Sequence, residues 1–333
     1  MSTKLRKTKK QKRISALVCV LFAAATLIGT VACFVRAPEV PRNEDPSDTI
    51  HNSDSETSDS PQQEDGLSRK DDFFTILVSG VDDGNGNSDT NILVAFDAGT
   101  GQVNCVSVPR DTLIDVDWGV KKINACYGRG GIELMAEKLE EMLGIPVDFT
   151  VTVDLQAFVQ LVNTIGGVEF DVPVNMDYDD PYQNLHIHFT KGYQYLTGED
   201  ALKVVRFRHN NDGSGYGTED LGRIGTQQAF LKAVAKKMLQ PKNIDKVSSY
   251  VQIFSDYVDT DLSVGNLAWF GTEMFSIGLE NINFMTLPGD GQGWYKGGSY
   301  YILYPDEVLT MVNTYLNPYS TDLTLNDMHV FAP

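Results

Sequence analysis

The sequence predicts an α/β fold, with helices layered on a sheet, preceded by one N-terminal transmembrane helix. From residue 72 onward, short apolar runs bounded by turn residues alternate with stretches whose apolar side chains recur at helical spacing. This alternation favours helices packed on a sheet. Upstream, a long uncharged segment follows a basic one, as in a membrane anchor. Because 42% of the residues are apolar, the chain can bury a sizeable core.

The N-terminal segment has the charge pattern of a signal anchor. Residues 1–13 hold seven Lys and Arg side chains and no acid, and the 22 residues of 14–35 carry no charge. A helix of that length crosses the roughly 30 Å hydrocarbon layer of a bilayer, and its basic flank stays cytoplasmic. We therefore expect a cytoplasmic tail, a single-pass anchor in the cell membrane and an extracellular domain. A cleaved signal peptide and a lipoprotein site at Cys33 remain alternatives.

The next segment, 36–71, is rich in Pro, Asp, Glu, Ser, Asn and Gln, and predicts an acidic disordered tether. The formal net charge of the chain is −18, and residues 1–13 contribute +7, which leaves −25 for the remainder. Phosphate contacts with nucleic acid need a broad basic surface. The charge of the exported part therefore argues against nonspecific binding to nucleic acid.

The elements of the predicted domain follow in order. Four apolar runs predict strands over 73–82, 90–101, 102–111 and 148–155. Helical spacing predicts helices over 130–144, which Gly144 ends, and over 155–167. Further helices are expected over 247–258, 266–278 and 304–316, and one more strand over 281–289.

Two cysteines lie in the predicted extracellular part, Cys105 and Cys126. Oxidising conditions permit a disulfide between them. Each sits in a segment with the pattern of a buried element, which favours two buried thiols instead. The sequence has no CxxC motif and no Cys/His cluster that would predict a zinc site.

Paired arginines occur in the segment VVRFRHN, residues 204–210. If this segment is a strand, Arg206 and Arg208 share one face, and Val205 and Phe207 point to the core. Two guanidinium groups on one face suit the oxygens of a phosphate. The alternative is a solvated face with local carboxylate partners.

A helix expected over 218–239 carries a polar stripe that faces inward. Thr218 is a possible N-cap. Asp220, Arg223 and Gln227 share a stripe that continues through core-type residues, as the lining of a cleft would. The alternative is a buried ion pair between Asp220 and Arg223. The preceding Gly-rich loop, 210–217, either closes over a ligand or only connects.

Acidic and basic side chains also gather in the N-terminal half of the domain. Asp82, Asp83 and Asp89 occupy a loop between strands, where oxygen ligands suit a hard divalent ion and where turn-forming Asp residues are also common. Arg110 and Asp111 follow a strand in VSVPRDT, and form either a local ion pair or an anion site.

Two lysines, Lys121 and Lys122, follow the loop after this strand, and are either surface residues or further phosphate contacts.

Six of these segments, in order, resemble the LytR-CpsA-Psr family of cell-wall glycopolymer ligases. They are LVSGVDD…SDTNILVAFD, VSVPRDT, KINACYGRGG, LVNTIGGVEFDVP, LTGEDALKVVRFRHN and DLGRIGTQQAFLKA. The resemblance implies a central mixed β-sheet flanked by helices, in a catalytic domain over 72–333 with its motif-bearing core over 73–237 and a C-terminal extension over 238–333. The chain departs from the pattern at Asn87 and Thr226, where many relatives carry arginine.

The resemblance also implies an activity. An undecaprenyl-pyrophosphate-linked glycopolymer, such as teichoic acid or a capsular or secondary wall polysaccharide, would be the donor. A peptidoglycan sugar hydroxyl, typically muramic acid C6, would be the acceptor, and the product would be a phosphodiester. The lipid tail would enter an apolar pocket between sheet and helices.

Roles for individual residues come from the same resemblance. Asp82 and Asp89 would hold Mg²⁺, or Mn²⁺ in its place. Asp220 would orient Arg223 or take the acceptor proton. The catalytic candidates are therefore Asp220 and Arg223, together with Arg110. The pyrophosphate would be bound by Arg110, Lys122, Arg206, Arg208, Arg223 and Gln227.

Two other functions use the same residues. Water in place of the sugar hydroxyl would make the protein a polyprenyl-pyrophosphate hydrolase. A protein that binds the lipid without turnover would be a regulator, although a body of charge −25 argues against binding to DNA.

Overall fold

The computed structural model describes residues 36–39, 68–81, 87–182, 184–217, 220–238, 240–244 and 246–333. Residues 262–276, with the described 36–39, belong to one compact unit and the other described residues to a second. The predicted anchor over 14–35 lies outside the described residues. Among the helices that are described, none is long and apolar enough to span a membrane.

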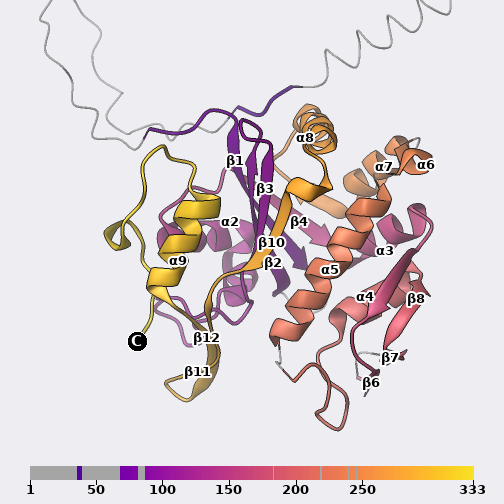
Figure 1. The fold of residues 1–333 in the computed structure, drawn as a ribbon. Coiled ribbons are helices and arrows are strands. Elements are labelled where there is room, and N and C mark those ends of the chain that lie inside the picture. Colours follow the sequence, from indigo (N-terminus) through magenta and orange to yellow (C-terminus); the bar gives the residue numbers. More distant parts are fainter. Residues whose placement is uncertain are drawn as a thin grey trace, which may run out of the picture. The chain divides into compact units, whose positions relative to one another are not determined.

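A six-stranded mixed sheet forms the centre of the larger unit (Figure 1). Its strands lie in the order β10-β3-β2-β1-β4-β9. β1 and β4 are parallel, as are β10 and β3, and the other neighbours are antiparallel. The strands are β1 (Phe73–Val81), β2 (Ser88–Asp97), β3 (Gln102–Ser107), β4 (Phe149–Asp154), β9 (Val258–Thr260) and β10 (Ile282–Thr286).

Three two-stranded sheets supplement the central one, pairing β5 with β8, β6 with β7, and β11 with β12. Their strands are β5 (Val168–Val172), β6 (Met176–Asp180), β7 (Leu185–Phe189), β8 (Gly192–Leu196), β11 (Gly289–Tyr295) and β12 (Gly298–Leu303). The helices are α2 (Asn124–Leu143), α3 (Leu155–Thr164), α4 (Gly198–Arg206), α5 (Asp220–Met238), α6 (Pro241–Ile244), α7 (Val247–Tyr257), α8 (Val264–Ile277) and α9 (Pro305–Met311), with a π-helical turn over Val312–Leu316 and short 3₁₀ turns over Leu279–Asn281 and Leu325–Asp327.

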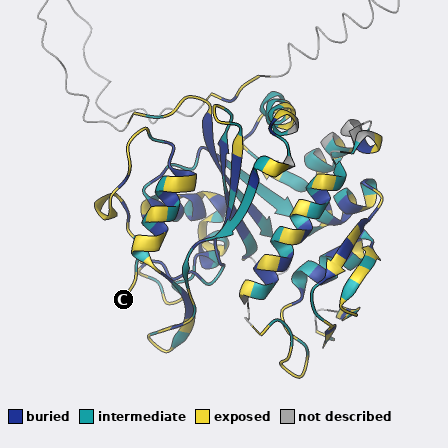
Figure 2. Ribbon diagram, viewed as in Figure 1, coloured by how far each residue is buried: buried dark blue, intermediate teal, exposed yellow. Residues whose placement is uncertain are grey.

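One hydrophobic core lies between the sheet and the helices α2 and α9. Leu77 and Leu93 of the sheet meet Met135 and Leu139 of α2 and Val308 of α9, all at most 1% exposed. Figure 2 shows buried and intermediate residues along the strands and exposed residues on α9. Removing this apolar surface from water is the main stabilising contribution to the fold.

A second core joins α3, α4 and α5 to the β5–β8 and β6–β7 sheets. Val162, Val204 and Phe230 come from the three helices, and Phe170 and Ile187 from strands β5 and β7. The alternation of VEFDV and LHIHF places Phe170 and Ile187 inward and their neighbours outward. This second core fixes the positions of α4 and α5, which carry arginines.

The predicted elements largely occur, with two differences in extent. α2 begins at Asn124, because a further helical segment precedes the predicted helix, and the non-helical Gly130 and Gly131, with φ 72° at Gly131, separate the two segments. Ordered contacts also begin earlier than residue 72, since Arg69 forms an ion pair with Asp148 and Lys70 donates to the Asn317 carbonyl. Residues 68–71 therefore belong to the folded domain and not to the tether.

Cys105 and Cys126 are not bridged, in agreement with the interpretation as two thiols. Burial raises the pKa of Cys105 to about 12 and that of Cys126 to about 11. Both groups are therefore protonated near neutral pH, and neither has the thiolate character of a reactive cysteine.

Candidate functional site

A cleft of about 360 Å³ lies at the ends of β1 and β2, beside α4 and α5. Within the described part of the chain, its lining combines arginines, one carboxylate and apolar side chains from segments far apart in sequence. The lining residues are Gly80, Val81, Asn87, Asp89, Thr90, Arg110, Asn124, Leu155, Tyr178, Leu185, Ile187, Leu202, Val205, Arg206, Phe207, Arg208, His209, Arg223 and Gln227.

A tight turn after β3 positions Arg110. The Thr112 amide and hydroxyl both donate to the Pro109 carbonyl, at 2.9 Å and 2.6 Å, which closes the turn. Thr112 is fully buried, and the Arg110 carbonyl accepts from the Asn124 amide at the start of α2. The backbone around Arg110 is therefore fixed on both sides, so its side chain extends from a rigid base.

The Arg110 guanidinium forms an ion pair with Asp89, which also lines the cleft. Its Nη1 donates to Asp89 Oδ1 at 2.6 Å, while its Nε lies 3.9 Å from Asp111 Oδ1. Asp111 instead has Lys122 as its closer partner, with Nζ at 3.1 Å. The first partner of Arg110 is thus a carboxylate distant in sequence and not its neighbour.

The segment with the paired arginines is not a strand, contrary to the prediction. Arg206 is the last residue of helix α4, which begins with a capping box between Thr197 and Asp200. Phe207 is extended, with φ −60° and ψ 133°, and ends the helix. One extended residue between them is enough to bring Arg206 and Arg208 to the same cleft, while Phe207 enters the core at 1% exposure. Val205 is partly buried and packs against the same core, and both residues also border the cleft.

Replacing Phe207 with alanine is expected to reduce the free energy of unfolding by about 3–5 kcal/mol, because a fully buried aromatic ring is lost and a cavity remains. The ring packs edge-on against Tyr216, with centroids 5.5 Å apart. Denaturant titration measures the change. Tyr193→Ala, on a residue 82% exposed, is the control and should stay within about 0.5 kcal/mol of the unchanged protein. A loss below about 1 kcal/mol for Phe207→Ala would contradict the packing role.

Helix α5 supplies the inward stripe that the sequence predicted. Arg223 is 4% exposed and its Nη2 lies 3.4 Å from the Asp89 carbonyl oxygen. Gln227 Nε2 donates at 3.2 Å to the carbonyl of Val205, and so ties α5 to the end of α4 just before Arg206. Asp220 is the first residue of the helix, and its side chain lies outside the described part.

The remaining predicted residues lie in different surroundings. Lys122 is not among the cleft-lining residues, and its Nζ lies over the Tyr300 ring at 5.5 Å from the centroid. Asp82 and Asp83 fall outside the described residues. Of the two departures from the family pattern, Asn87 lines the cleft, whereas the buried Thr226 hydroxyl lies 2.9 Å from the Tyr216 hydroxyl.

Several lining residues were not predicted as site residues. Tyr178 and Ile187 come from the β6–β7 hairpin, and His209 packs edge-on against Tyr178 with centroids 5.7 Å apart. Asn124 opens α2 beside the Arg110 turn. His209 directly follows the paired arginines, and Asn124 closely follows the lysine pair. Their position next to a charged motif could therefore have identified both as site residues. The sequence of the hairpin has no charged motif that predicts a contribution to the cleft.

The cleft joins two kinds of lining. Arg110, Arg206, Arg208 and Arg223 place four permanent positive charges around one carboxylate, Asp89. Beside them, an apolar wall is formed by Val81, Leu155, Leu185, Ile187, Leu202 and Val205. The charged part suits an anion with several oxygens, and the apolar part suits a hydrocarbon.

The fold and the cleft describe a mixed α/β protein with a site for a ligand that has an anionic part and an apolar part. Residues 43–317 match the model of the LytR_cpsA_psr family, and the chain belongs to that family. The polyisoprenyl-teichoic acid–peptidoglycan teichoic acid transferase TagV of Bacillus subtilis strain 168 is 34% identical over 201 residues, which cover 57% of this chain and 50% of TagV.

Two further comparisons extend this result. TagU of Bacillus cereus, whose name describes the same transferase activity, is 30% identical over 259 residues, covering 76% of this chain and 81% of TagU. The crystal structure of B. subtilis TagV matches with a TM-score of 0.61 at 27% identity, covering 74% of this chain and 96% of that chain. The chain thus spans about half the length of the full TagV protein and most of TagU.

Proposed function

We propose that this protein is a transferase that moves a glycopolymer from a polyprenyl-pyrophosphate carrier to a peptidoglycan sugar hydroxyl. The observation that carries the proposal is the junction of four arginines with an apolar wall in one cleft. A lipid pyrophosphate has the matching two parts, a polyanionic head and a hydrocarbon tail. The names of the TagV and TagU relatives support teichoic acid as the type of polymer.

The reaction exchanges one phosphoester partner for another. The acceptor hydroxyl oxygen forms a bond to the phosphorus that carries the glycopolymer, and the bond from that phosphorus to the bridging oxygen breaks. Lipid monophosphate leaves with the electron pair, and the hydroxyl proton passes to a base. Asp220 is the candidate for that base by family resemblance.

Phosphoryl transfer depends on positioning and on neutralising charge that develops on the phosphate oxygens. Arg110 and Arg223 are the best placed for this task, because both contact Asp89 and are largely buried. Arg206, at the end of α4, and Arg208, two residues later, line the same cleft. The bidentate geometry of guanidinium groups fixes the orientation of the pyrophosphate.

A divalent cation fits the described donor set. Asp89 is 43% exposed at its side chain and borders the cleft, so it offers a carboxylate beside the place proposed for the phosphates. Mg²⁺ commonly uses one or two carboxylates with phosphate oxygens and water, and Mn²⁺ accepts similar ligands. Asp89 would hold the ion with Asp82, and the ion would add positive charge at the phosphate oxygens.

A second groove, of about 350 Å³, is the proposed approach for the acceptor sugar. It shares Arg208 with the cleft, and Asp111, the neighbour of Arg110, lines it too. Tyr304 is 46% exposed on its wall, and Asp290 and Gln292 add polar groups. Tyrosine rings offer flat faces to sugar C–H groups, and the polar groups bind hydroxyls.

Tyr304→Ala is expected to raise the KM for a peptidoglycan acceptor about 2- to 10-fold, because one stacking platform contributes about 0.5–1.5 kcal/mol. The Kd for the lipid-linked donor should not change. Steady-state kinetics at varied acceptor concentration provide the measurement. Tyr315→Ala, on an exposed ring that does not line the groove, is the matched control. A change confined to donor binding would place the acceptor elsewhere.

We further propose that residues 14–35 anchor the protein as a single-pass segment, with residues 1–13 cytoplasmic and the catalytic domain extracellular. The uncharged run and its basic flank support this arrangement. The donor lipid lies in the same membrane, so the anchor keeps the cleft near its substrate.

The function is tested by incubating the full-length chain with a lipid-linked glycopolymer, Mg²⁺ and peptidoglycan. A phosphodiester-linked polymer–peptidoglycan product is expected. Phosphate-terminated glycan without a linked product would instead support hydrolysis. Binding of the donor without either product would support a regulatory lipid-binding protein.

A further inference from the structure

The β6–β7 hairpin presents two histidines and two carboxylates on its outer face. Asp177 pairs with His188 and Asp179 with His186 in the antiparallel register. Ile187, between the two histidines, is 1% exposed, and Met176 is 2% exposed, so the inner face is held in the second core. A shift of one residue in the strand register would turn all four polar side chains toward the core. Packing of the inner face therefore fixes their common outward orientation.

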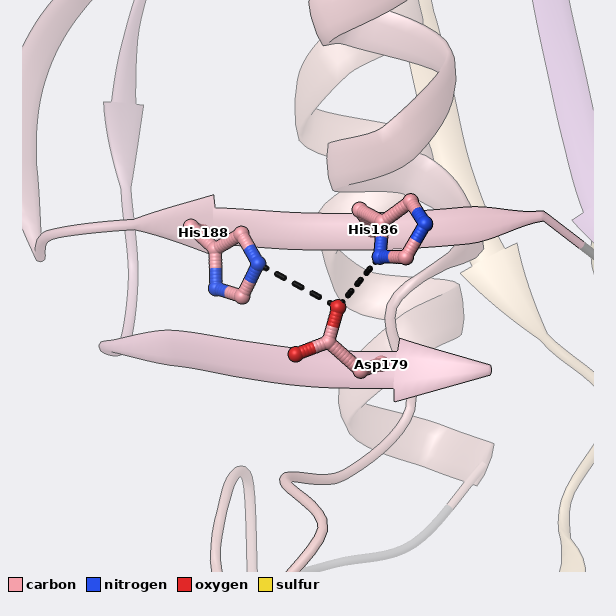
Figure 3. A group of neighbouring side chains, drawn as sticks. All are labelled: Asp179, His186 and His188. Carbon is pink, nitrogen blue, oxygen red and sulfur yellow. Dashed lines mark hydrogen bonds and ion pairs between the residues drawn. The ribbon is translucent and has the colours of Figure 1, made fainter. Parts of the chain in front are cut away.

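Three of these side chains are close enough to share one ion. One ligand atom each from Asp179, His186 and His188 lies within 4.8 Å of the others. Figure 3 shows both imidazole rings facing the same carboxylate, from the strand opposite. His186 Nδ1 is hydrogen-bonded to Asp179 Oδ1, and His188 Nε2 lies 3.4 Å from that oxygen.

Asp177 completes the arrangement from outside the triad. Its Oδ1 lies 2.8 Å from Nδ1 of His188, the ring nitrogen that does not face Asp179. A histidine ligand of a metal usually donates its other N–H to a carboxylate, which fixes the tautomer and makes the ligating nitrogen more basic.

We propose that Asp179, His186 and His188 form a site for a first-row transition metal ion of the Zn²⁺ type, with Asp177 orienting His188. Two imidazoles and one carboxylate are the ligands that Zn²⁺ accepts, and three protein ligands leave one position for water. Mg²⁺ prefers oxygen ligands. This site is therefore chemically distinct from the carboxylate site proposed at Asp89, and it does not depend on the proposed transfer reaction.

The ion would stiffen a wall of the cleft. Tyr178 and Ile187, on the inner face of the same hairpin, line that cleft. The outer edge of β6 is also tied to the loop after Arg208, since Asn210 Oδ1 accepts from the Asp177 amide at 2.6 Å and Asn211 Oδ1 from the Asp179 amide at 2.7 Å. A metal that links β6 to β7 thus restrains the apolar wall and the loop that follows Arg208.

The test is a Zn²⁺ titration of the full-length chain, without a polyhistidine tag, in competition with a chromophoric chelator. One equivalent of Zn²⁺ is expected to bind in the presence of millimolar Mg²⁺. His186→Gln and His188→Gln should each weaken binding at least about 10-fold, and Asp177→Asn about 10- to 100-fold. His329→Gln is the matched control, because His329 is also exposed but lies outside the hairpin.

Amide hydrogen exchange gives the second measurement. Zn²⁺ should slow exchange over residues 176–189 and 208–215 in the unchanged chain and not in the His186→Gln/His188→Gln double variant. Both histidines are about half exposed, at 51% and 54%, so these variants should fold, which circular dichroism checks.

Two results would overturn the site. One is Zn²⁺ binding to the double variant that equals binding to the unchanged chain. The other is an unchanged chain that binds no Zn²⁺ at about 100 µM. Unchanged affinity in Asp177→Asn would overturn the orienting role.

Discussion

Arg110→Ala is expected to lower kcat/KM for glycopolymer transfer about 10²- to 10³-fold, the effect of removing one preorganised donor from a charged transition state. The side chain extends from a turn closed by Thr112 and faces the proposed phosphate position beside Asp89. Arg110→Lys keeps the charge and loses the planar fork, so an intermediate rate is expected. Steady-state kinetics on the full-length chain with a lipid-linked donor measure both variants.

Arg129→Ala is the matched control, since its guanidinium lies over the Trp118 ring at 4.9 Å and does not line the cleft. A double-mutant cycle with Asp89→Ala tests whether Arg110 does no more than neutralise Asp89. If Arg110 only neutralises Asp89, the double variant should recover activity that Arg110→Ala loses. Such recovery, or an Arg110→Ala rate within about 3-fold of the unchanged protein, would contradict a phosphate-binding role, because it falls well below the loss expected for a catalytic donor.

Asp89→Asn is expected to reduce transfer by about 100-fold or more at low Mg²⁺, because the amide removes the negative charge that would hold the cation. Added Mg²⁺ should restore part of the rate, so the apparent activation constant for Mg²⁺ should rise. Chelation should abolish transfer by the unchanged protein, and Mg²⁺ or Mn²⁺ should restore it. Rates measured over a Mg²⁺ titration provide the test.

Asp259→Asn serves as the control for this experiment, since Asp259 is an exposed carboxylate on β9, away from the lining of the cleft. Transfer that persists in chelator would remove the cation from the mechanism. Loss of transfer in Asp89→Asn without any change in the Mg²⁺ requirement would instead assign Asp89 to the positioning of Arg110.

The order of strands and helices followed well from the sequence. The runs that became β1, β2, β3 and β4 are apolar enough to be recognised individually, and Gly144 ended α2 in the left-handed conformation as predicted, at φ 69°. Family membership, expected from six ordered segments, is confirmed by the match over residues 43–317. Local pattern is sufficient there because burial of one face fixes each of these elements.

The hairpins and the segment around Arg206 did not follow from the sequence. VVRFRHN has the alternation of a strand, yet its first three residues close helix α4, because the capping box at Thr197 and packing of Val204 in the second core favour the helix. Short strands such as β6 and β7 carry little periodicity, and their pairing depends on the turn and on the core beneath them. The cleft wall they form was therefore not foreseen.

By itself, the sequence determined the kind of side chains available, namely arginines and carboxylates in recognisable motifs, and the inward direction of the Arg223–Gln227 stripe. Only the tertiary structure decided which of them meet. Arg110 contacts Asp89 and not chiefly Asp111, and Lys122 contacts Asp111 outside the cleft. The physical reason is that partners of a charged group depend on distances across neighbouring strands and helices, which sequence separation does not measure.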